Sequence, residues 1–335
     1  MKVLLTGGSG FLGAHCIESL LKHGHDVVTT VRSHAQGQKI LDAHSQVPAS
    51  CLSYVVVEDI AAKGSFDEAV RSDPPFDAVV HTASPFHFNI FTTAEKDLLE
   101  PAIKGTVEIL KAIKEHAPTV RKVVITSSFV AILNFTAHPE LYTEDCWNPV
   151  TWQAATENSG DAYPGSKTLA EQAAWDYVEK EKPTFTLSVI NPPLIYGPIV
   201  HHLDSLSAVN TSNTIFRDII QGKLENSLPP TSAFPDWVDV RDVALAHVRA
   251  LEIPEAAGKR FILAAGKYSN PEIAGIIRDN FPDLRAKLPK DLKGDLPGVG
   301  YLFNNDRSKD ILKIVYRPLD LCVIDSVNSL LIKSH

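Results

Sequence analysis

The chain has 335 residues with a formal net charge of −8, and 44% of its residues are hydrophobic and 21% charged. This composition is typical of a globular protein, and the length allows one large domain with a smaller partner. The acidic balance, with Lys and Arg scattered, argues against nucleic acid or an anionic membrane as a partner. The apolar run at residues 2–5 ends at a TGG sequence, and no segment approaches the length of a membrane span, so we expect a cytoplasmic protein.

A glycine-rich turn lies close to the N-terminus. The string TGGSGFLG at residues 6–13 follows the short apolar run and precedes residues 14–24, where apolar residues recur at helical spacing before a glycine. A strand, a glycine turn and a helix in this order form a phosphate cradle, because glycines allow close backbone approach and a helix N-terminus attracts anions. The G-x-x-G-x-x-G spacing is a variant of the dinucleotide fingerprint, so it predicts nucleotide binding.

Apolar runs and helical patterns then alternate along the first 190 residues. The predicted strands are continuous Val/Ile/Leu runs, which is typical of a parallel sheet covered on both faces. Such sheets bind ligands at the carboxyl ends of their strands. After the first strand, the predicted strands are residues 26–31, 52–57, 78–81, 122–126 and 186–190, with long helices at residues 98–116 and 162–182.

The pattern is less regular after residue 191, although a strand running into a helix near residue 251, a buried strand at 260–264 and a helix at 270–280 are still predicted. We predict an α/β fold: a Rossmann-type, doubly wound parallel sheet with a smaller, discontinuous, C-terminal substrate-binding domain. The predicted division assigns residues 1–191, 236–265 and 318–335 to the cofactor domain and residues 192–235 and 266–317 to the substrate domain.

Arg32 follows the second predicted strand. In a dinucleotide fold this position is usually acidic and holds the adenosine ribose, whereas an arginine can pair with a 2′-phosphate. No Asp or Glu occurs between Val27 and Ile40. The alternative is a solvated surface arginine, but the charge pattern favours NADPH/NADP⁺ over NADH/NAD⁺.

Tyr163 and Lys167 are four residues apart on a predicted helix, so their side chains share one face. A nearby ammonium lowers the pKa of a phenol, and such a tyrosine can give a proton to a carbonyl oxygen during reduction. Because Pro164 fits only the first turn of a helix, we expect Tyr163 near a helix N-terminus. Ser127 and Ser128 end the fifth strand, where one hydroxyl can bind that oxygen and the other can satisfy backbone in the turn.

Histidines and aromatic residues give weaker signals. His81, His87, His201 and His202 lack usable ligand spacing, and the four cysteines are far apart, so we predict no metal site. Several aromatic residues follow strand ends and are candidates for the wall of an apolar substrate pocket, with core packing as the alternative. These residues are Phe86, Phe88, Phe129, Phe135 and Tyr196.

Together, several strings resemble the extended short-chain dehydrogenases/reductases. They are the glycine turn, Ser128, Tyr163-x-x-x-Lys167, Asn191-Pro192 and WVDVRDV at residues 237–243. Other strings are similar to the dihydroflavonol reductase-like branch, in particular to fungal NADPH-dependent methylglyoxal, aldehyde and ketone reductases. They are HTASPF at residues 81–86, DLLEPA at 97–102, WNPVTW at 147–152 and AAW at 173–175.

The resemblance implies a role for each matching position. Tyr163 would donate the proton, Lys167 would hold the nicotinamide ribose and tune Tyr163, and Ser128 would fix the carbonyl. Arg32 would bind the 2′-phosphate. Gln36 stands where related reductases often carry a second basic residue, and Lys39 is a candidate substitute. The other implied cofactor contacts are Gly7, Gly8, Ser9, Gly10, Phe11, Leu12, Asp59, Ile60, Thr82, Ala83, Pro192, Ile195 and Ser212.

The sequence therefore predicts an NADPH-dependent carbonyl reductase that acts on a small-molecule aldehyde or ketone as a monomer or homodimer. A reductase for dihydroflavonol- or cinnamoyl-type compounds is the alternative within the superfamily. A nucleotide-sugar epimerase is disfavoured because the second half of the chain has no obvious basic cluster for a diphosphate. A catalytically silent NADP-sensing regulator is the alternative from another class, against which the joint presence of Ser128, Tyr163 and Lys167 argues.

Overall fold

The computed structural model describes residues 1–84, 93–296, 298 and 300–333. Within these residues, seven parallel strands form one sheet in the order β10-β7-β5-β4-β1-β2-β3. The order reverses between β1 and β4, as in a doubly wound sheet, so the predicted Rossmann-type fold is confirmed. The strands are β1 (Lys2–Thr6), β2 (Asp26–Val31), β3 (Leu52–Val56), β4 (Ala78–His81), β5 (Lys122–Thr126), β7 (Thr186–Asn191) and β10 (Arg260–Ile262).

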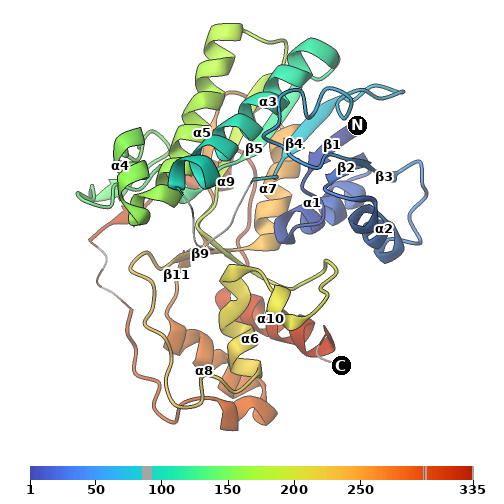
Figure 1. The fold of residues 1–335 in the computed structure, drawn as a ribbon. Coiled ribbons are helices and arrows are strands. Elements are labelled where there is room, and N and C mark those ends of the chain that lie inside the picture. Colours follow the sequence, from blue (N-terminus) through green and yellow to red (C-terminus); the bar gives the residue numbers. More distant parts are fainter. Residues whose placement is uncertain (85–92, 297, 299, 334–335) are drawn as a thin grey trace.

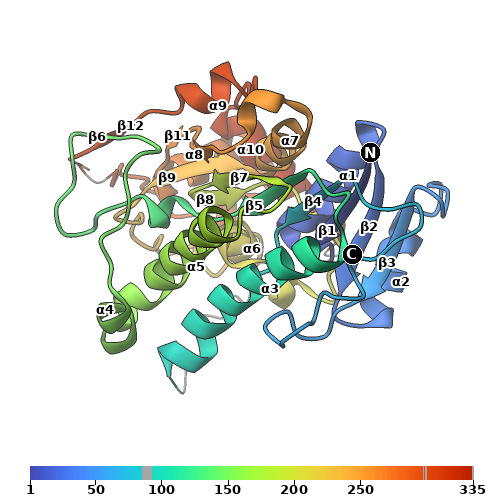
Figure 2. The ribbon, with the colours of Figure 1, turned by 90° about the horizontal axis from the view of Figure 1, so that it is seen from above.

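Helices cover both faces of this sheet (Figures 1 and 2). Successive residues of a strand point to opposite faces, so Leu5 packs in the cluster that contains the α1 and α7 side chains, whereas Leu4 packs in the cluster that contains those of α3 and α5. The burial of both faces explains why the strands are continuous apolar runs. The covering helices are α1 (Phe11–Lys22), α2 (His34–Ala43), α3 (Glu100–His116), α5 (Ser159–Glu181) and α7 (Val240–Glu252).

A second group of elements lies below the sheet in Figure 1 and packs in a cluster of its own. A small sheet of β11 (Gly266–Lys267), β9 (Asp236–Asp239) and β8 (Leu194–Tyr196) connects this group to the first. Helix α10 (Leu319–Lys333) packs here, beside α6 (Thr214–Ile220) and α8 (Asn270–Asn280), although we assigned its residues to the cofactor domain. The division into domains stays a prediction.

Shorter elements complete the described fold. Strands β6 (Leu141–Tyr142) and β12 (Leu302–Phe303) pair with each other. The remaining helical elements are a π-helix η1 (Glu95–Leu99), the α-helices α4 (Trp152–Glu157) and α9 (Asp306–Asp310), and the 3₁₀ helices η2 (Phe129–Ala131), η3 (Leu206–Ala208), η4 (Thr211–Asn213), η5 (Pro254–Ala256) and η6 (Pro282–Lys287).

The start of α5 differs from the prediction. The helix begins at Ser159, capped by the Asn158 side chain, so Pro164 lies inside it and not in its first turn. A proline at this position removes the hydrogen bond to the carbonyl of residue 160. Residue 160 is a glycine close to the helix end, which limits the steric conflict, and Thr168 donates its hydroxyl to the Pro164 carbonyl. Tyr163 therefore lies in the second turn of α5.

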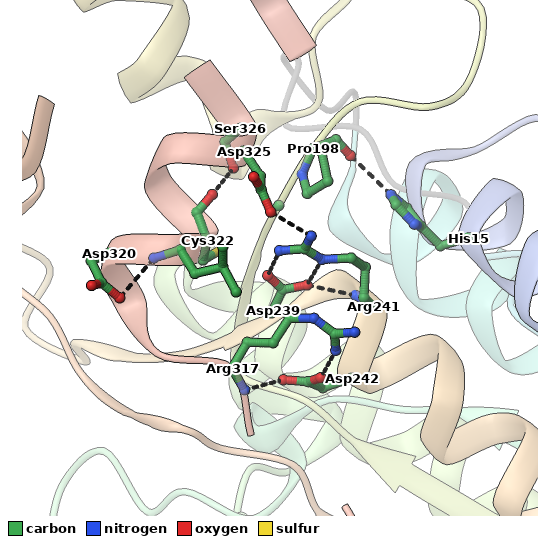
Figure 3. A network of polar contacts seen from close by, with 12 residues as sticks. His15, Pro198, Asp239, Arg241, Asp242, Arg317, Asp320, Cys322, Asp325 and Ser326 are labelled. Atoms are coloured by element: carbon green, nitrogen blue, oxygen red, sulfur yellow. Dashed lines mark hydrogen bonds and ion pairs between the residues drawn. The ribbon is translucent and has the colours of Figure 1, made fainter. Parts of the chain in front are cut away.

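An arginine–aspartate network ties the C-terminal helix to the start of α7 (Figure 3). Arg241 bridges two carboxylates, Asp239 at 2.7 Å and Asp325 of α10 at 2.6 Å. Asp242 accepts hydrogen bonds from the backbone N–H and the guanidinium of Arg317. Because Asp239 and Asp242 are fully buried, these arginines are needed to compensate their charges. The network holds α10 and β9 in a fixed position against the sheet.

Candidate active site

The glycine turn lies at the carboxyl end of β1, at the point where the strand order reverses. Gly7 has φ +81°, and a Cβ there would lie 3.1 Å from the Ala83 backbone. A Cβ on Gly13 would lie 2.1 Å from the Gly7 carbonyl oxygen, so both positions require glycine. Gly10 caps α1 without a side-chain hydrogen bond, and the first turn holds no acidic residue. This helix N-terminus suits an anionic pyrophosphate, and the residues present therefore fit the predicted dinucleotide.

Strands β1 and β4 are joined side by side at this edge. The Thr6 hydroxyl accepts a hydrogen bond from the Ala83 N–H at 3.1 Å and pairs with His81 Nδ1 at 2.8 Å. The Thr82 hydroxyl donates to the Thr6 carbonyl at 2.7 Å. Thr82 and Ala83, both predicted cofactor contacts, are thus held against the glycine turn.

Tyr163 and Ser128 come together from α5 and the end of β5. A hydrogen bond links the Tyr163 phenol to the Ser128 hydroxyl. Burial raises the pKa of the phenol, and this hydrogen bond offsets part of the rise. Lys167 Nζ lies 5.9 Å from the centre of the Tyr163 ring, and the expectation that this ammonium lowers the pKa of the phenol stays a prediction. A phenol with a raised pKa is protonated at neutral pH, which is the state that a proton donor needs.

Lys167 lies in the same place but has a different partner. Its Nζ donates to the Ser84 hydroxyl at 2.9 Å, which ties α5 to the segment after β4. Burial lowers the pKa of the Lys167 ammonium to about 8. Burial and this nearby charge together lower the pKa of His81 to about 3, so His81 is neutral. Lys167 is thus a half-buried cation beside Tyr163 and the end of β4.

The two serines have separate roles in the structure. Ser127 donates its hydroxyl to the buried carboxylate of Glu171 at 2.5 Å. The Ser128 hydroxyl accepts from the Val130 N–H at 3.3 Å, so one of the two serines does satisfy backbone in the turn, as the alternative expected. Glu171 also accepts from Arg260 Nε at 2.5 Å and from Asn191 Nδ2 at 2.7 Å. Asn191 in turn donates to the Ser128 carbonyl at 3.2 Å. This buried network fixes the backbone on which Ser128 presents its hydroxyl.

Arg32 is exposed just beyond β2, on the same edge as the glycine turn. Its backbone N–H donates to the Gln36 side chain at 3.2 Å. Gln36 lines a cavity of about 100 Å³ together with Gly8, Ser9 and Lys39. Arg32 itself does not line this cavity, so its contact with a 2′-phosphate stays a prediction.

The remaining predicted cofactor contacts lie in two places: Pro192, Ile195 and Ser212 come after β7, and Asp59 and Ile60 come after β3. Pro192 accepts a hydrogen bond from the Phe129 N–H at 2.8 Å, and the Ser212 hydroxyl donates to the Ile195 carbonyl, so these segments meet beyond the sixth predicted strand. Asp59 is exposed and caps its own turn through the Ala61 N–H. Ile60 packs against α3 at Gly105. The structure fixes where these residues lie, and their contacts to a cofactor stay predictions.

The predicted substrate wall is corrected at two positions. Phe129 is 1% exposed and packs edge-on against Tyr142 and Phe303. Tyr196 is 2% exposed and packs in the second core cluster, against Phe216. Both rings therefore fill cores: Phe129 begins η2 after β5, and Tyr196 is the last residue of β8. Phe135 is half-buried against Phe234, whereas Phe86 and Phe88 lie outside the described residues.

Sequence reasoning missed Ser84 and Glu171 as members of this region. Ser84 stands within HTASPF, but its pairing with Lys167 spans 83 positions and is invisible to local patterns. Glu171 follows Lys167 by four residues, and this helical spacing was the signal available for it.

No described helix has the length and hydropathy needed to cross a membrane. Among the same residues, no group of three or more His, Cys, Asp or Glu side chains could hold a metal ion.

Comparisons with known proteins agree with this arrangement. A model of the NAD dependent epimerase/dehydratase family matches residues 3–265. The ketoreductase azaE of Aspergillus niger is 48% identical over 98% of this chain and 97% of its own. A putative NADPH-dependent methylglyoxal reductase, GRP2 of Candida albicans, is 42% identical over 86% of this chain and 85% of its own.

Solved structures give the same result. The crystal structure of Gre2 from Candida albicans in complex with NADPH has a TM-score of 0.88, is 36% identical, and matches all of both chains. Fold, glycine turn and relatives lead to one conclusion: the chain belongs to the NAD dependent epimerase/dehydratase family.

Proposed function

We propose that this protein is an NADPH-dependent carbonyl reductase that converts an aldehyde or ketone into an alcohol. The observation that carries the proposal is the hydrogen-bonded pair of Tyr163 and Ser128 beside the half-buried Lys167, at the sheet edge that holds the glycine turn. The ketoreductase and methylglyoxal reductase relatives support the same reaction class, and the Gre2–NADPH complex supports the cofactor.

The cofactor would lie across the switch point of the sheet. The backbone of Gly7–Leu12 would hold the pyrophosphate, Arg32 the 2′-phosphate, and Thr82 and Ala83 the central part of the dinucleotide. Asp59, Ile60, Pro192, Ile195 and Ser212 are proposed as flanking contacts. When bound, NADPH supplies the hydride that is added to the carbonyl carbon.

The chain supplies the proton and orients the carbonyl. The hydroxyls of Ser128 and Tyr163 bind the carbonyl oxygen, where negative charge develops during reduction. Tyr163 then gives its phenolic proton to that oxygen, and the alcohol forms. Burial keeps the phenol protonated until this step, because it raises the pKa. The Lys167 ammonium stabilises the phenolate that the transfer leaves behind.

The test measures NADPH oxidation with small dicarbonyls, aryl ketones and dihydroflavonol- or cinnamoyl-type compounds. The proposal expects turnover with small carbonyls, whereas preferred turnover of the bulky phenolic substrates would move the assignment to the alternative reductase class. Tight NADPH binding with no turnover across the panel would instead support the NADP-sensing regulator. Interconversion of a nucleotide sugar without net NADPH oxidation would indicate an epimerase.

A further inference from the structure

The loop after β8 forms a strap, defined here as residues 200–204, beside the glycine turn. Its base is fixed on two helices. Pro198 O pairs with His15 Nε2 of α1 at 2.9 Å (Figure 3), and Ile199 N–H donates to Ser329 of α10 at 2.9 Å. Lys333 Nζ donates to the His201 carbonyl at 3.0 Å. Contacts from α1 and α10 therefore hold the strap in place beside α1.

The end of the strap is linked to α2 by an ion pair. Asp204 Oδ1 accepts from Lys39 Nζ at 2.6 Å and lies 3.0 Å from His202 Nε2. The Asp204 side chain is 79% exposed and that of Lys39 is 41% exposed. Exposed ion pairs of this kind are weak, so a stronger anionic ligand can displace the carboxylate.

This ion pair borders the cavity beside the glycine turn. The cavity of about 100 Å³ is lined by Gly8 and Ser9 of the turn, by Gln36 and Lys39 of α2, and by Asp204. Gln36 is uncharged and binds the Arg32 backbone N–H. Lys39 therefore supplies a positive charge that reaches the cavity from α2, and Asp204 neutralises it.

We propose that Asp204 is a specificity-determining residue, which competes with the 2′-phosphate of NADPH for Lys39 and so limits the preference for NADPH over NADH. This inference rests on the proposed function, since it needs a nicotinamide dinucleotide at the glycine turn. A dianionic phosphate attracts the ammonium more strongly than a carboxylate does, and the carboxylate that remains nearby repels the phosphate. NADH carries no 2′-phosphate, so its binding does not disturb the ion pair.

The test compares the dissociation constants of NADPH and NADH, measured by nicotinamide fluorescence at low ionic strength. The variants are Asp204→Asn, Lys39→Gln and the double variant. Glu181→Gln is the matched control. It also removes one carboxylate from an ion pair, with Lys114 at 2.6 Å, but Glu181 is the last residue of α5 and does not line the cavity. A melting curve of each variant checks that it is folded.

We expect Asp204→Asn to tighten NADPH binding about fivefold and to leave NADH binding nearly unchanged, with the gain shrinking as salt is added. Lys39→Gln should weaken NADPH binding. When Asp204→Asn is added to Lys39→Gln, the gain in NADPH affinity should be less than half the gain that Asp204→Asn gives in the wild type. An unchanged NADPH-to-NADH ratio in Asp204→Asn, or an equal gain for both dinucleotides, would overturn the inference. If the wild-type chain bound neither dinucleotide, the proposed function would fail, and this inference with it.

Discussion

Replacing Glu171 should destabilise the protein more than any surface change, because this carboxylate is the centre of a buried polar network. Glu171 is 2% exposed, and the Arg260 guanidinium that donates to it at 2.5 Å is 7% exposed. It also receives hydrogen bonds from Ser127 and Asn191, at 2.5 and 2.7 Å. The Glu171→Leu variant leaves a buried positive charge without its carboxylate. It also removes one acceptor from each of three neutral donors, Ser127, Asn191 and the Trp175 indole.

The size of the effect follows from this burial. Removing one partner of a buried ion pair costs about 3–5 kcal/mol. Arg260 keeps its hydrogen bonds to the Glu144 and Cys146 carbonyls and its contact with the Trp147 ring at 3.7 Å, so we expect about 4 kcal/mol. An unfolding entropy of about 2.1 cal/mol/K per residue gives roughly 0.7 kcal/mol/K for this length of chain, so Tm should fall by about 6 °C.

The assay is urea and thermal unfolding of the wild type, the single variants Glu171→Leu and Arg260→Met, and the double variant Glu171→Leu/Arg260→Met. We expect the double variant to be more stable than the single one, because no buried charge is left unpaired. Glu181→Leu is the control, since its ion pair with Lys114 is exposed and its loss should not be measurable. A loss under about 1 kcal/mol for Glu171→Leu, or a double variant as unstable as the sum of both single changes, would show that Glu171 does not compensate the buried charge of Arg260.

Three further predictions concern the site. Lys167 is charged below its pKa of about 8, so kcat/KM for carbonyl reduction should fall as the pH rises past about 8; a profile that stays flat to pH 10 would contradict this, since Tyr163, with its raised pKa, stays protonated in that range. Ser84→Ala removes the hydroxyl that accepts from the Lys167 ammonium at 2.9 Å, so the alkaline limb of that profile should move to lower pH, and an unmoved limb would show that Ser84 does not act on Lys167. Arg32→Asp should shift the ratio of NADPH to NADH affinity at least about tenfold towards NADH, as measured by fluorescence titration, whereas an unchanged ratio would remove Arg32 from the phosphate site.

The sheet and the edge that carries the site were predictable from the sequence. Each strand is a short apolar run buried on both faces, and these runs match the observed strands within about a residue or two. The positions of Ser128 and the glycine turn follow, because parallel strands bring their carboxyl ends to one edge. The start of α5 was misplaced because Pro164 suggested a first turn, whereas the Asn158 cap begins the helix earlier.

Contacts between distant side chains were not predictable. Asp204 contacts Lys39 across 165 positions, and Lys167 contacts Ser84 across 83 positions. No helix or strand periodicity in the sequence indicates contacts over such separations. Phe129 and Tyr196 were placed in a pocket because aromatic residues after strand ends suit both a pocket and a core. Only the packed structure, where each ring meets other aromatic rings, distinguishes the two.

The most direct test of the account is the Tyr163→Phe variant, which removes only the hydroxyl that would donate the proton. The measurement pairs NADPH binding, by fluorescence titration, with the rate of NADPH oxidation by a small dicarbonyl. We expect NADPH affinity close to that of the wild type and a rate lower by about 10²–10⁴-fold, the usual contribution of a general acid. Full activity in Tyr163→Phe would contradict the proposed mechanism.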